Sequence, residues 1–195
     1  MASPAKSVWD TESSERLGEL ERVHTVVRGR GPGRRWYTDQ LNRSLFVALV
    51  AQFQIYCRNL HSDAVAAYLS PVSAPQHEVL QRLLVQDLQL NRRNPRRGVL
   101  GRDFRRLGLD LIGIMNAQST RVRGDLERLD LLIDFRNAIV HGNELAIQSH
   151  IAAGLVATNL KSYKQFKKTT DRLVNTMDSI VSTYLADELR TSPPW

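Results

Sequence analysis

The feature that most constrains this chain is a long segment with helical periodicity between Thr38 and Leu69. Thr38 is a suitable N-cap for such a helix, and Pro71 and Pro75 bracket its end. Spacings of three and four residues place one set of mainly apolar positions on a single face: Leu41, Leu45, Ala48, Leu49, Gln52, Phe53, Tyr56 and Leu60. No other segment of the chain is as regular.

The rest of the sequence also favours helices. A short amphipathic helix is predicted over 13–27, and the segment 28–33, rich in glycine and basic residues, ends it. Further helical or apolar segments are predicted at Gln76–Leu90 (with Val79, Leu83 and Leu84 on its apolar side), Gly108–Asn116, Asp125–Val140, Glu144–Ala157 and Asn159–Leu189. Gly142 suits the left-handed position that ends a helix.

No internal repeat and no β-alternation of useful length is found, so the predicted fold class is all-α. We expect an up-and-down helical bundle with two long core helices and additional shorter helices. The expected organisation is an N-terminal helix and basic turn over 1–36, a helical domain over 37–189 and a tail over 190–195.

Composition fits one globular domain in a reducing compartment. The chain has 195 residues, of which 42% are hydrophobic and 24% charged, which is enough to bury one core. The single cysteine, Cys57, is expected to be a small buried thiol. No apolar run approaches the roughly 20 residues that span a bilayer, and the N-terminus lacks the pattern of a signal peptide. We therefore expect a cytoplasmic protein with no membrane contact.

The net charge of +7 favours contact with polyanions such as nucleic acids. Basic residues concentrate between Asn91 and Arg106, where Asp103 is the only acid and Pro95, Gly98 and Gly101 are expected to interrupt regular structure. Seven arginines fall there: Arg92, Arg93, Arg96, Arg97, Arg102, Arg105 and Arg106. This basic segment is either a mobile solvated connector or an arm that contacts phosphates. A second basic set, along the last helix, is interpreted as a solvated face: Lys161, Lys164, Lys168 and Arg172.

The most informative single residue is Arg136, within the predicted helix Leu126–Val140. At 100° per residue it falls near the middle of an apolar arc of about 160°. The apolar residues of this arc are Leu129, Leu132, Ile133, Phe135, Ile139 and Val140. Arginine keeps its charge, so a partner must meet it: either a carboxylate in a structural ion pair or a phosphate gripped by the guanidinium.

His141 and Asn137 favour the second alternative, in which the guanidinium of Arg136 binds a phosphate. His141 follows the helix, and histidine is a side-chain type suited to proton transfer. Five residues of helix rise are about 7.5 Å, within reach of a long arginine side chain. Asn137 adds a neutral donor and acceptor. Metal-free RNA cleavage needs three kinds of group: a proton acceptor or donor, a cation that stabilises the developing phosphorane charge, and a group that orients them.

The stretch from Asp134 to Asn143, with its sequence Arg-Asn-Ala-Ile-Val-His-Gly, resembles the motif that closes a helix in HEPN domains. The long first helix, with Gln52 to Leu60, also resembles the first core helix of prokaryotic HEPN families. The resemblance implies a HEPN-like bundle over roughly Tyr37 to Leu189, dimerised so that two motifs build one ribonuclease site. It also implies a role as a toxin, an antiphage effector or an RNA-processing enzyme. Several members of the family carry an acidic residue on the first core helix.

In this chain Gln54 stands where that acid is expected, and Asp63 and Asp39 are the alternatives. The expected function is therefore a metal-independent endoribonuclease acting as a homodimer on RNA, with Arg136, Asn137 and His141 as catalytic residues and no metal or cofactor. The alternative is a non-catalytic HEPN helper or nucleic-acid-binding module in which Arg136 is structural. A cognate antitoxin of the nucleotidyltransferase type is a further expected partner.

The other histidines lack the spacing of metal ligands and are expected at the surface or capped: His24, His61, His77 and His150.

Overall fold

The computed structural model describes residues 1–27 and 34–195, and all regular structure in these ranges is helical, which confirms the all-α prediction. The predicted turn at 28–33 lies outside the described residues. The elements, with η1 a π-helical turn and η2 a 3₁₀ turn, are α1 (Pro4–Val8), η1 (Trp9–Ser13), α2 (Ser14–Val27), α3 (Arg34–Leu69), α4 (Ala74–Val85), η2 (Gln89–Asn91), α5 (Arg97–Arg105), α6 (Leu111–Gln118), α7 (Thr120–Val140), α8 (Glu144–Ala152) and α9 (Leu160–Leu189).

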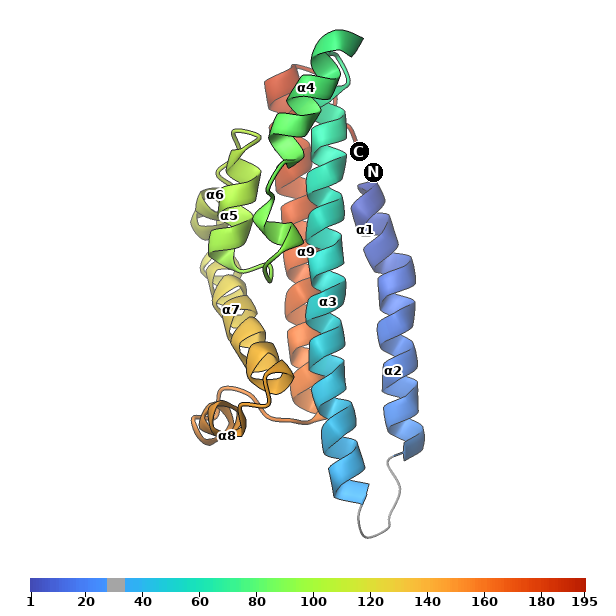
Figure 1. Ribbon diagram of the computed structural model, residues 1–195, viewed down its shortest axis with the longest axis vertical. Helices are drawn as coiled ribbons and strands as arrows, with labels where there is room; N and C mark the ends of the chain where they lie inside the picture. The colour runs from blue at the N-terminus through green and yellow to red at the C-terminus, as the bar shows by residue number, and fades with distance from the viewer. Residues whose placement is uncertain (28–33) are drawn as a thin grey trace.

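The core is built on α3 and α9, which lie side by side along the long axis of the molecule (Figure 1). α7 packs against both, and α1 and α2 run along the opposite side of α3. At the junction of α3, α7 and α9, the ring of Phe46 meets Phe135, Tyr163 and Phe166 edge to face, at centroid distances of 5.1, 6.1 and 5.9 Å. Each of these buried rings contributes about 1.5–3 kcal/mol through the area it removes from water.

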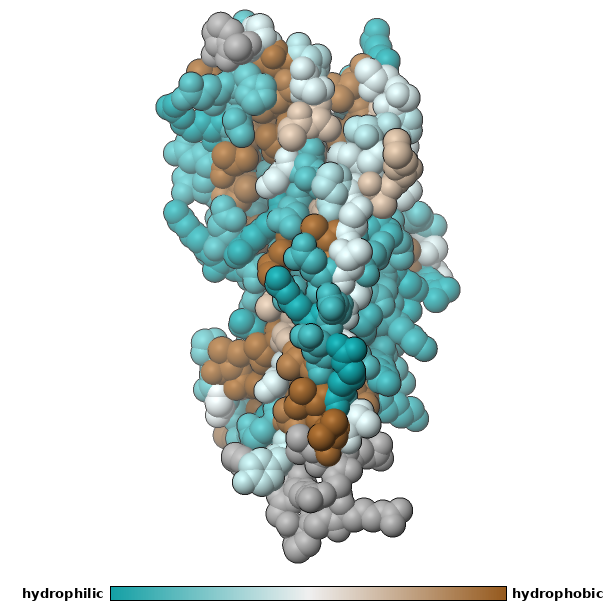
Figure 2. Space-filling model, turned by 90° about the vertical axis from the view of Figure 1, so that its right-hand side faces the viewer, coloured by the Kyte–Doolittle hydropathy of each residue, from teal (hydrophilic) through white to brown (hydrophobic). Residues whose placement is uncertain are grey.

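The N-terminal elements share this core. Trp9 in η1 is buried, and its ring centroid lies 6.2 Å from that of Phe53 and 6.1 Å from that of Tyr56. Its indole Nε1 donates to Asp171 Oδ1 on α9 at 3.1 Å. Figure 2 looks onto this side of the molecule and shows hydrophilic residues interspersed with hydrophobic ones in both its upper and lower parts. Val26, near the C-terminal end of α2, is exposed.

Several predicted helix ends are confirmed by local capping. Gly142 adopts a φ of +62° directly after α7, as the left-handed position requires. Asn159 caps α9 by accepting a hydrogen bond from the backbone of Ser162 at 2.8 Å.

Two other helix ends differ from the prediction. α7 begins earlier than predicted because the Ser119 hydroxyl accepts from the amide of Val122 at 3.2 Å. α8 ends earlier than predicted, shortly before Gly154, whose φ is +67°.

The prediction that Thr38 caps the long helix is wrong. α3 begins at Arg34, so Thr38 lies within the first turns of the helix. No glycine or proline separates Arg34 from Thr38, and the intervening residues have adequate helix propensity, so nothing in the backbone stops the helix from extending towards its N-terminus.

The predicted helix Gln76–Leu90 is in fact two elements. α4 ends at Val85, and the chain passes through Asp87, at a φ of +54°, before forming η2. The cause is the buried carboxylate of Asp103, which accepts the amides of Gln89 at 3.0 Å and Leu90 at 2.7 Å. The predicted apolar side of this segment is also mostly unburied: the side chains of Val79 and Leu83 are exposed, and Leu84 alone of the three packs against the core.

The basic segment is more regular than predicted. Gly98 and Gly101 do not interrupt it but lie inside α5. Gly101 has a packing reason to lack a side chain, because a Cβ there would lie 3.3 Å from Ile112 Cγ1 on α6. The glycine therefore allows α5 and α6 to approach closely.

The cysteine and two of the histidines are buried. Cys57 is buried as predicted, and burial raises the pKa of its thiol well above the usual value. His24 and His61, expected at the surface or capped, are 3% and 0% exposed. His61 Nε2 donates to the carbonyl of Asp103 at 3.2 Å, whereas neither ring nitrogen of His24 has a hydrogen-bond partner among residues 1–27 and 34–195.

Candidate functional site

A polar hollow of about 530 Å³ lies where α3, α7 and the segment between η2 and α5 meet. Five of its ten lining residues are arginines, three are asparagines, and no carboxylate is among them. The lining residues are Gln54, Arg58, Asn91, Arg92, Arg93, Asn94, Arg96, Val99, Arg136 and Asn137. We call this the arginine hollow. Arg136 and Asn137, predicted from the sequence as site residues, both line it.

The wall opposite α7 is held in place by two side chains of α3. Gln54 Nε2 donates to the carbonyls of Leu90 and Arg93, at 2.9 Å each. One turn further along, Arg58 Nε donates to the same Leu90 carbonyl at 2.8 Å. A carboxylate at position 54 would face these carbonyl oxygens without a proton to offer, so a glutamine here serves to hold the loop.

On the α7 side of the hollow, three side chains form a hydrogen-bond network. Asn94 Nδ2 donates to Asn137 Oδ1 at 2.7 Å, and Arg136 Nη1 donates to the same oxygen at 3.2 Å. Asn137 therefore orients Arg136 and ties it to the basic segment. Arg136 Nε is buried and has no hydrogen-bond partner.

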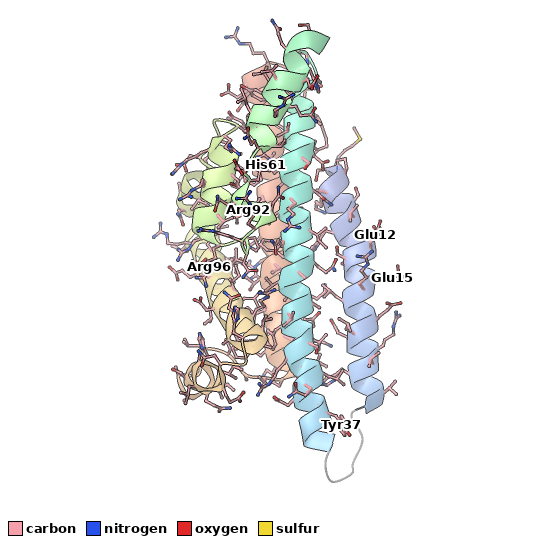
Figure 3. The ribbon with its side chains drawn as sticks, in the orientation of Figure 1. Glu12, Glu15, Tyr37, His61, Arg92 and Arg96 are labelled. Atoms are coloured by element: carbon pink, nitrogen blue, oxygen red, sulfur yellow. The ribbon has the colours of Figure 1, made fainter. Side chains whose placement is uncertain are left out.

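The hollow carries excess positive charge. Arg92 pairs with Asp87 at 3.0 Å, and Arg96 pairs with Asp134. Figure 3 shows Arg92 and Arg96 on the side of α3 that faces α5 and α7. Arg93 and Arg136 make no ion pair with any residue in the described ranges. A structural ion pair for Arg136 within the chain, one of the two sequence interpretations, is thus not observed in this part of the structure.

His141 lies outside the lining of the hollow. It is the exposed C-cap residue of α7, with a φ of −88°, and its backbone amide donates to the Asn137 carbonyl at 3.0 Å. Within one chain the hollow therefore brings together Arg136 and Asn137 but not His141. The side chain of His141 faces solvent at the turn between α7 and α8.

The other four arginines of the basic segment are distributed elsewhere. Arg97 pairs with Asp130 at 2.5 Å, Arg105 pairs with Asp110 at 3.2 Å, and Arg106 donates to the Gln86 carbonyl. Arg102 lines two neighbouring surface pockets on α5. The predicted phosphate-contacting set thus divides: Arg92, Arg93 and Arg96 face the hollow, and the remainder mostly stabilise α5.

The alternatives for the missing acid do not reach the hollow. The Asp63 carboxylate accepts the amide of Ala5 at 2.8 Å, and burial raises its pKa. Asp39 pairs with Arg43 at 2.7 Å. Asn94, Arg58 and Asn91 were not predicted as site residues. Gln54 and Arg58 lie one helical turn apart on α3, and this spacing, which places both on the same side of the helix, is a signal that could have identified Arg58.

Residues 1–27 and 34–195 contain no group of three or more histidine, cysteine, aspartate or glutamate side chains placed to hold a metal ion. The same ranges contain no helix that is both long and apolar enough to cross a membrane. Comparisons with protein-family models, with curated proteins and with solved structures found no significant match.

Proposed function

We propose that this protein is a metal-independent endoribonuclease whose site is completed by a second copy of the chain. The observation that carries the proposal is the arginine hollow, where Arg136 is half-buried, held by Asn137 and without a carboxylate partner in the described chain. A buried guanidinium nitrogen with a free donor requires an acceptor. A phosphate oxygen of RNA satisfies it with a charge-assisted hydrogen bond.

The reaction uses the 2′-hydroxyl of RNA as nucleophile. Its oxygen bonds to the adjacent phosphorus while the bond from phosphorus to the 5′-oxygen breaks, leaving a 2′,3′-cyclic phosphate and a 5′-hydroxyl. His141 takes the proton from the nucleophile or returns one to the leaving oxygen. Arg136 stabilises the negative charge that develops on the non-bridging oxygens, and Asn137 keeps the guanidinium in place. Each step balances without a metal ion.

The position of His141 favours a site shared between two copies. Within one chain it does not line the hollow, although the chemistry needs it close to Arg136. Apolar side chains flank it along the sequence: Val140 is 49% exposed and Leu145 86% exposed. Exposed apolar residues beside a functional group are typical of contact surfaces. A two-fold dimer through this turn would bring the His141 of one copy towards the hollow of the other.

The proposal is tested by incubating single-stranded RNA with the purified protein in EDTA. We expect cleavage products that end in a cyclic phosphate. Arg136→Ala and His141→Ala should each reduce the rate by about 10²–10⁴-fold, because each removes a charge or proton-transfer group used in the transition state. Far-ultraviolet circular dichroism should be unchanged.

Matched controls are Arg105→Ala and His77→Ala, which remove the same side chains from outside the hollow. Both should retain wild-type cleavage. Cleavage that requires a divalent metal, or that survives both Arg136→Ala and His141→Ala, would exclude the proposed mechanism.

A non-catalytic RNA-binding module is the second candidate, favoured by the absence of His141 from the hollow of a single chain. It predicts that RNA binds without being cut and that Arg136→Ala weakens binding. If Arg136 is instead a structural residue at a dimer interface, Arg136→Ala should lower the melting temperature by many degrees, because it leaves a buried charge unpaired.

A further inference from the structure

A second concave site lies where α2 ends and α3 and α9 begin. Figure 1 shows these helix ends towards one end of the bundle. Its volume is about 720 Å³, and it shares no residue with the arginine hollow. The lining residues are His24, Thr38, Asn42, Asn159, Leu160, Lys161, Lys164, Gln165 and Lys168. We call this the lysine pocket.

Two buried side chains lining the lysine pocket have unsatisfied polar atoms. His24 is 3% exposed, and neither of its ring nitrogens has a hydrogen-bond partner in the part of the chain that the structure describes. Asn42 is 4% exposed; its amide nitrogen donates to the Thr158 carbonyl at 2.8 Å, but its Oδ1 accepts nothing. Buried polar atoms without partners cost free energy, so their concentration at one pocket points to a ligand that supplies both acceptors and donors.

The charge of the pocket defines the acceptor part of that ligand. Lys161, Lys164 and Lys168 project from one face of α9, and no carboxylate is among the lining residues. The only ion pair that these lysines make in the described chain is Lys164 with Glu21, at 3.6 Å. The pocket also includes Asn159 and Leu160, at the N-terminus of the 30-residue helix α9, where free backbone amides and the helix dipole favour anions.

We propose that the lysine pocket binds a small phosphorylated metabolite that also carries hydroxyl groups. The lysines and the start of α9 hold the phosphates, and the imidazole of His24 contributes a donor and an acceptor. A ligand hydroxyl donates to Asn42 Oδ1, an interaction that an inorganic phosphate can supply only from a protonated oxygen. A concave pocket with buried polar atoms and this volume suits a small molecule better than a polymer.

The binding test is isothermal titration calorimetry with two organic probes, fructose bisphosphate and adenosine diphosphate, and with inorganic pyrophosphate. We expect at least one organic probe to bind more tightly than pyrophosphate. Lys161→Gln and Lys168→Gln should each weaken that binding by about tenfold, because each removes a charge-assisted hydrogen bond. Lys167→Gln is the matched control: Lys167 pairs with Asp171 and does not line the pocket, so affinity should not change.

A second variant separates a ligand site from a packing defect. His24→Leu replaces an unsatisfied buried side chain with an apolar one, so it should raise the melting temperature of the free protein by about 2–4 °C while weakening the organic probe at least tenfold. The proposal is overturned if neither organic probe binds, if Lys167→Gln weakens binding as much as Lys161→Gln, or if a short single-stranded RNA binds through Lys161 and Lys168 in place of the probes. Lys161→Gln should leave RNA cleavage unchanged, because the lysine pocket shares no residue with the arginine hollow. A failed metabolite-binding test with normal cleavage therefore leaves the proposed ribonuclease standing.

Discussion

At the scale of single residues, His61 shows how burial sets a charge state. Its ring packs edge to face on Phe104, and Nε2 donates to the Asp103 carbonyl. Because the carbonyl can only accept, the proton resides on Nε2, and the buried Nδ1 has no partner for a second proton. Burial lowers the pKa of His61 below its usual value of 6.5, and the hydrogen bond to Asp103 offsets only part of this effect.

The lowered pKa predicts a pH dependence of stability. Above the unfolded-state pKa of about 6.5 both states are neutral; below it the unfolded chain gains a proton that the folded chain does not bind. The free energy of unfolding should therefore fall as the pH drops from 7 to 5, with a His61 contribution of at most about 1.4 kcal/mol per pH unit. Urea melts of wild type and His61→Gln measure it.

The glutamine variant can still donate to the Asp103 carbonyl, so it should remove the His61 part of this slope. His77→Gln, which replaces a histidine on α4, should retain the wild-type slope. Parallel pH profiles for wild type and His61→Gln would contradict the assignment of a lowered pKa to His61.

Some residues of the two sites can be predicted from the sequence, and others cannot. Helical periodicity singles out Arg136, because it falls within the apolar arc of its helix, and Asn137 is found from its position between Arg136 and His141. Asn94 reaches Asn137 across 43 positions and Gln54 reaches Leu90 across 36, and no local pattern carries such contacts. The unpaired nitrogens of His24 were equally invisible, because they depend on how α2 lies on α3 and α9.

At the scale of elements, α7 and α9 are joined by a partly buried ion pair. Arg172 Nε contacts Asp125 Oδ2 at 2.7 Å, a second hydrogen bond joins the same two groups, and the Asp125 side chain is only 6% exposed. The sequence interpretation placed Arg172 on a solvated face with the three lysines. It instead contacts α7, and the hydrogen bond with Asp125 raises its pKa.

Removing this arginine should destabilise the bundle. Arg172→Ala leaves the buried Asp125 carboxylate without its partner and should lower the free energy of unfolding by roughly 2–3 kcal/mol. Arg82→Ala, which breaks the exposed pair with Glu78, should cost less than about 0.5 kcal/mol. Denaturant melts compare the two variants.

A double variant separates this ion pair from general packing. Asp125→Leu combined with Arg172→Met removes both charges and should recover most of the loss. If Arg172→Ala costs no more than Arg82→Ala, the pair does not hold α7 to α9.

The positions of most helices could be predicted from periodicity, since α3, α7 and α9 carry long apolar faces. The break between α4 and η2 could not, because the Asp103 carboxylate that causes it lies 13 and 14 positions away along the chain. α1 and η1 were missed because a segment this short has no clear periodicity, and its Trp9 is recognisable as a core residue only once α3 is in place.

At the scale of the whole molecule, the bundle presents two polar sites on different faces. The arginine hollow lies between α3, α7 and the basic segment, and the lysine pocket lies at the end where α9 begins. His141 and the exposed apolar residues Val140 and Leu145 lie at the turn between α7 and α8. We propose that two copies join at this turn, so that Arg136 of one copy and His141 of the other form one site.

The most direct test is to mix the two inactive variants, Arg136→Ala and His141→Ala, allow subunits to exchange, and measure RNA cleavage in EDTA. A mixed dimer contains one intact pair, with Arg136 from one copy and His141 from the other. We expect each variant alone to be inactive. The mixture should regain up to about a quarter of wild-type activity, because half the dimers are mixed and each mixed dimer restores one of two pairs. A mixture that stays as inactive as its components would contradict it.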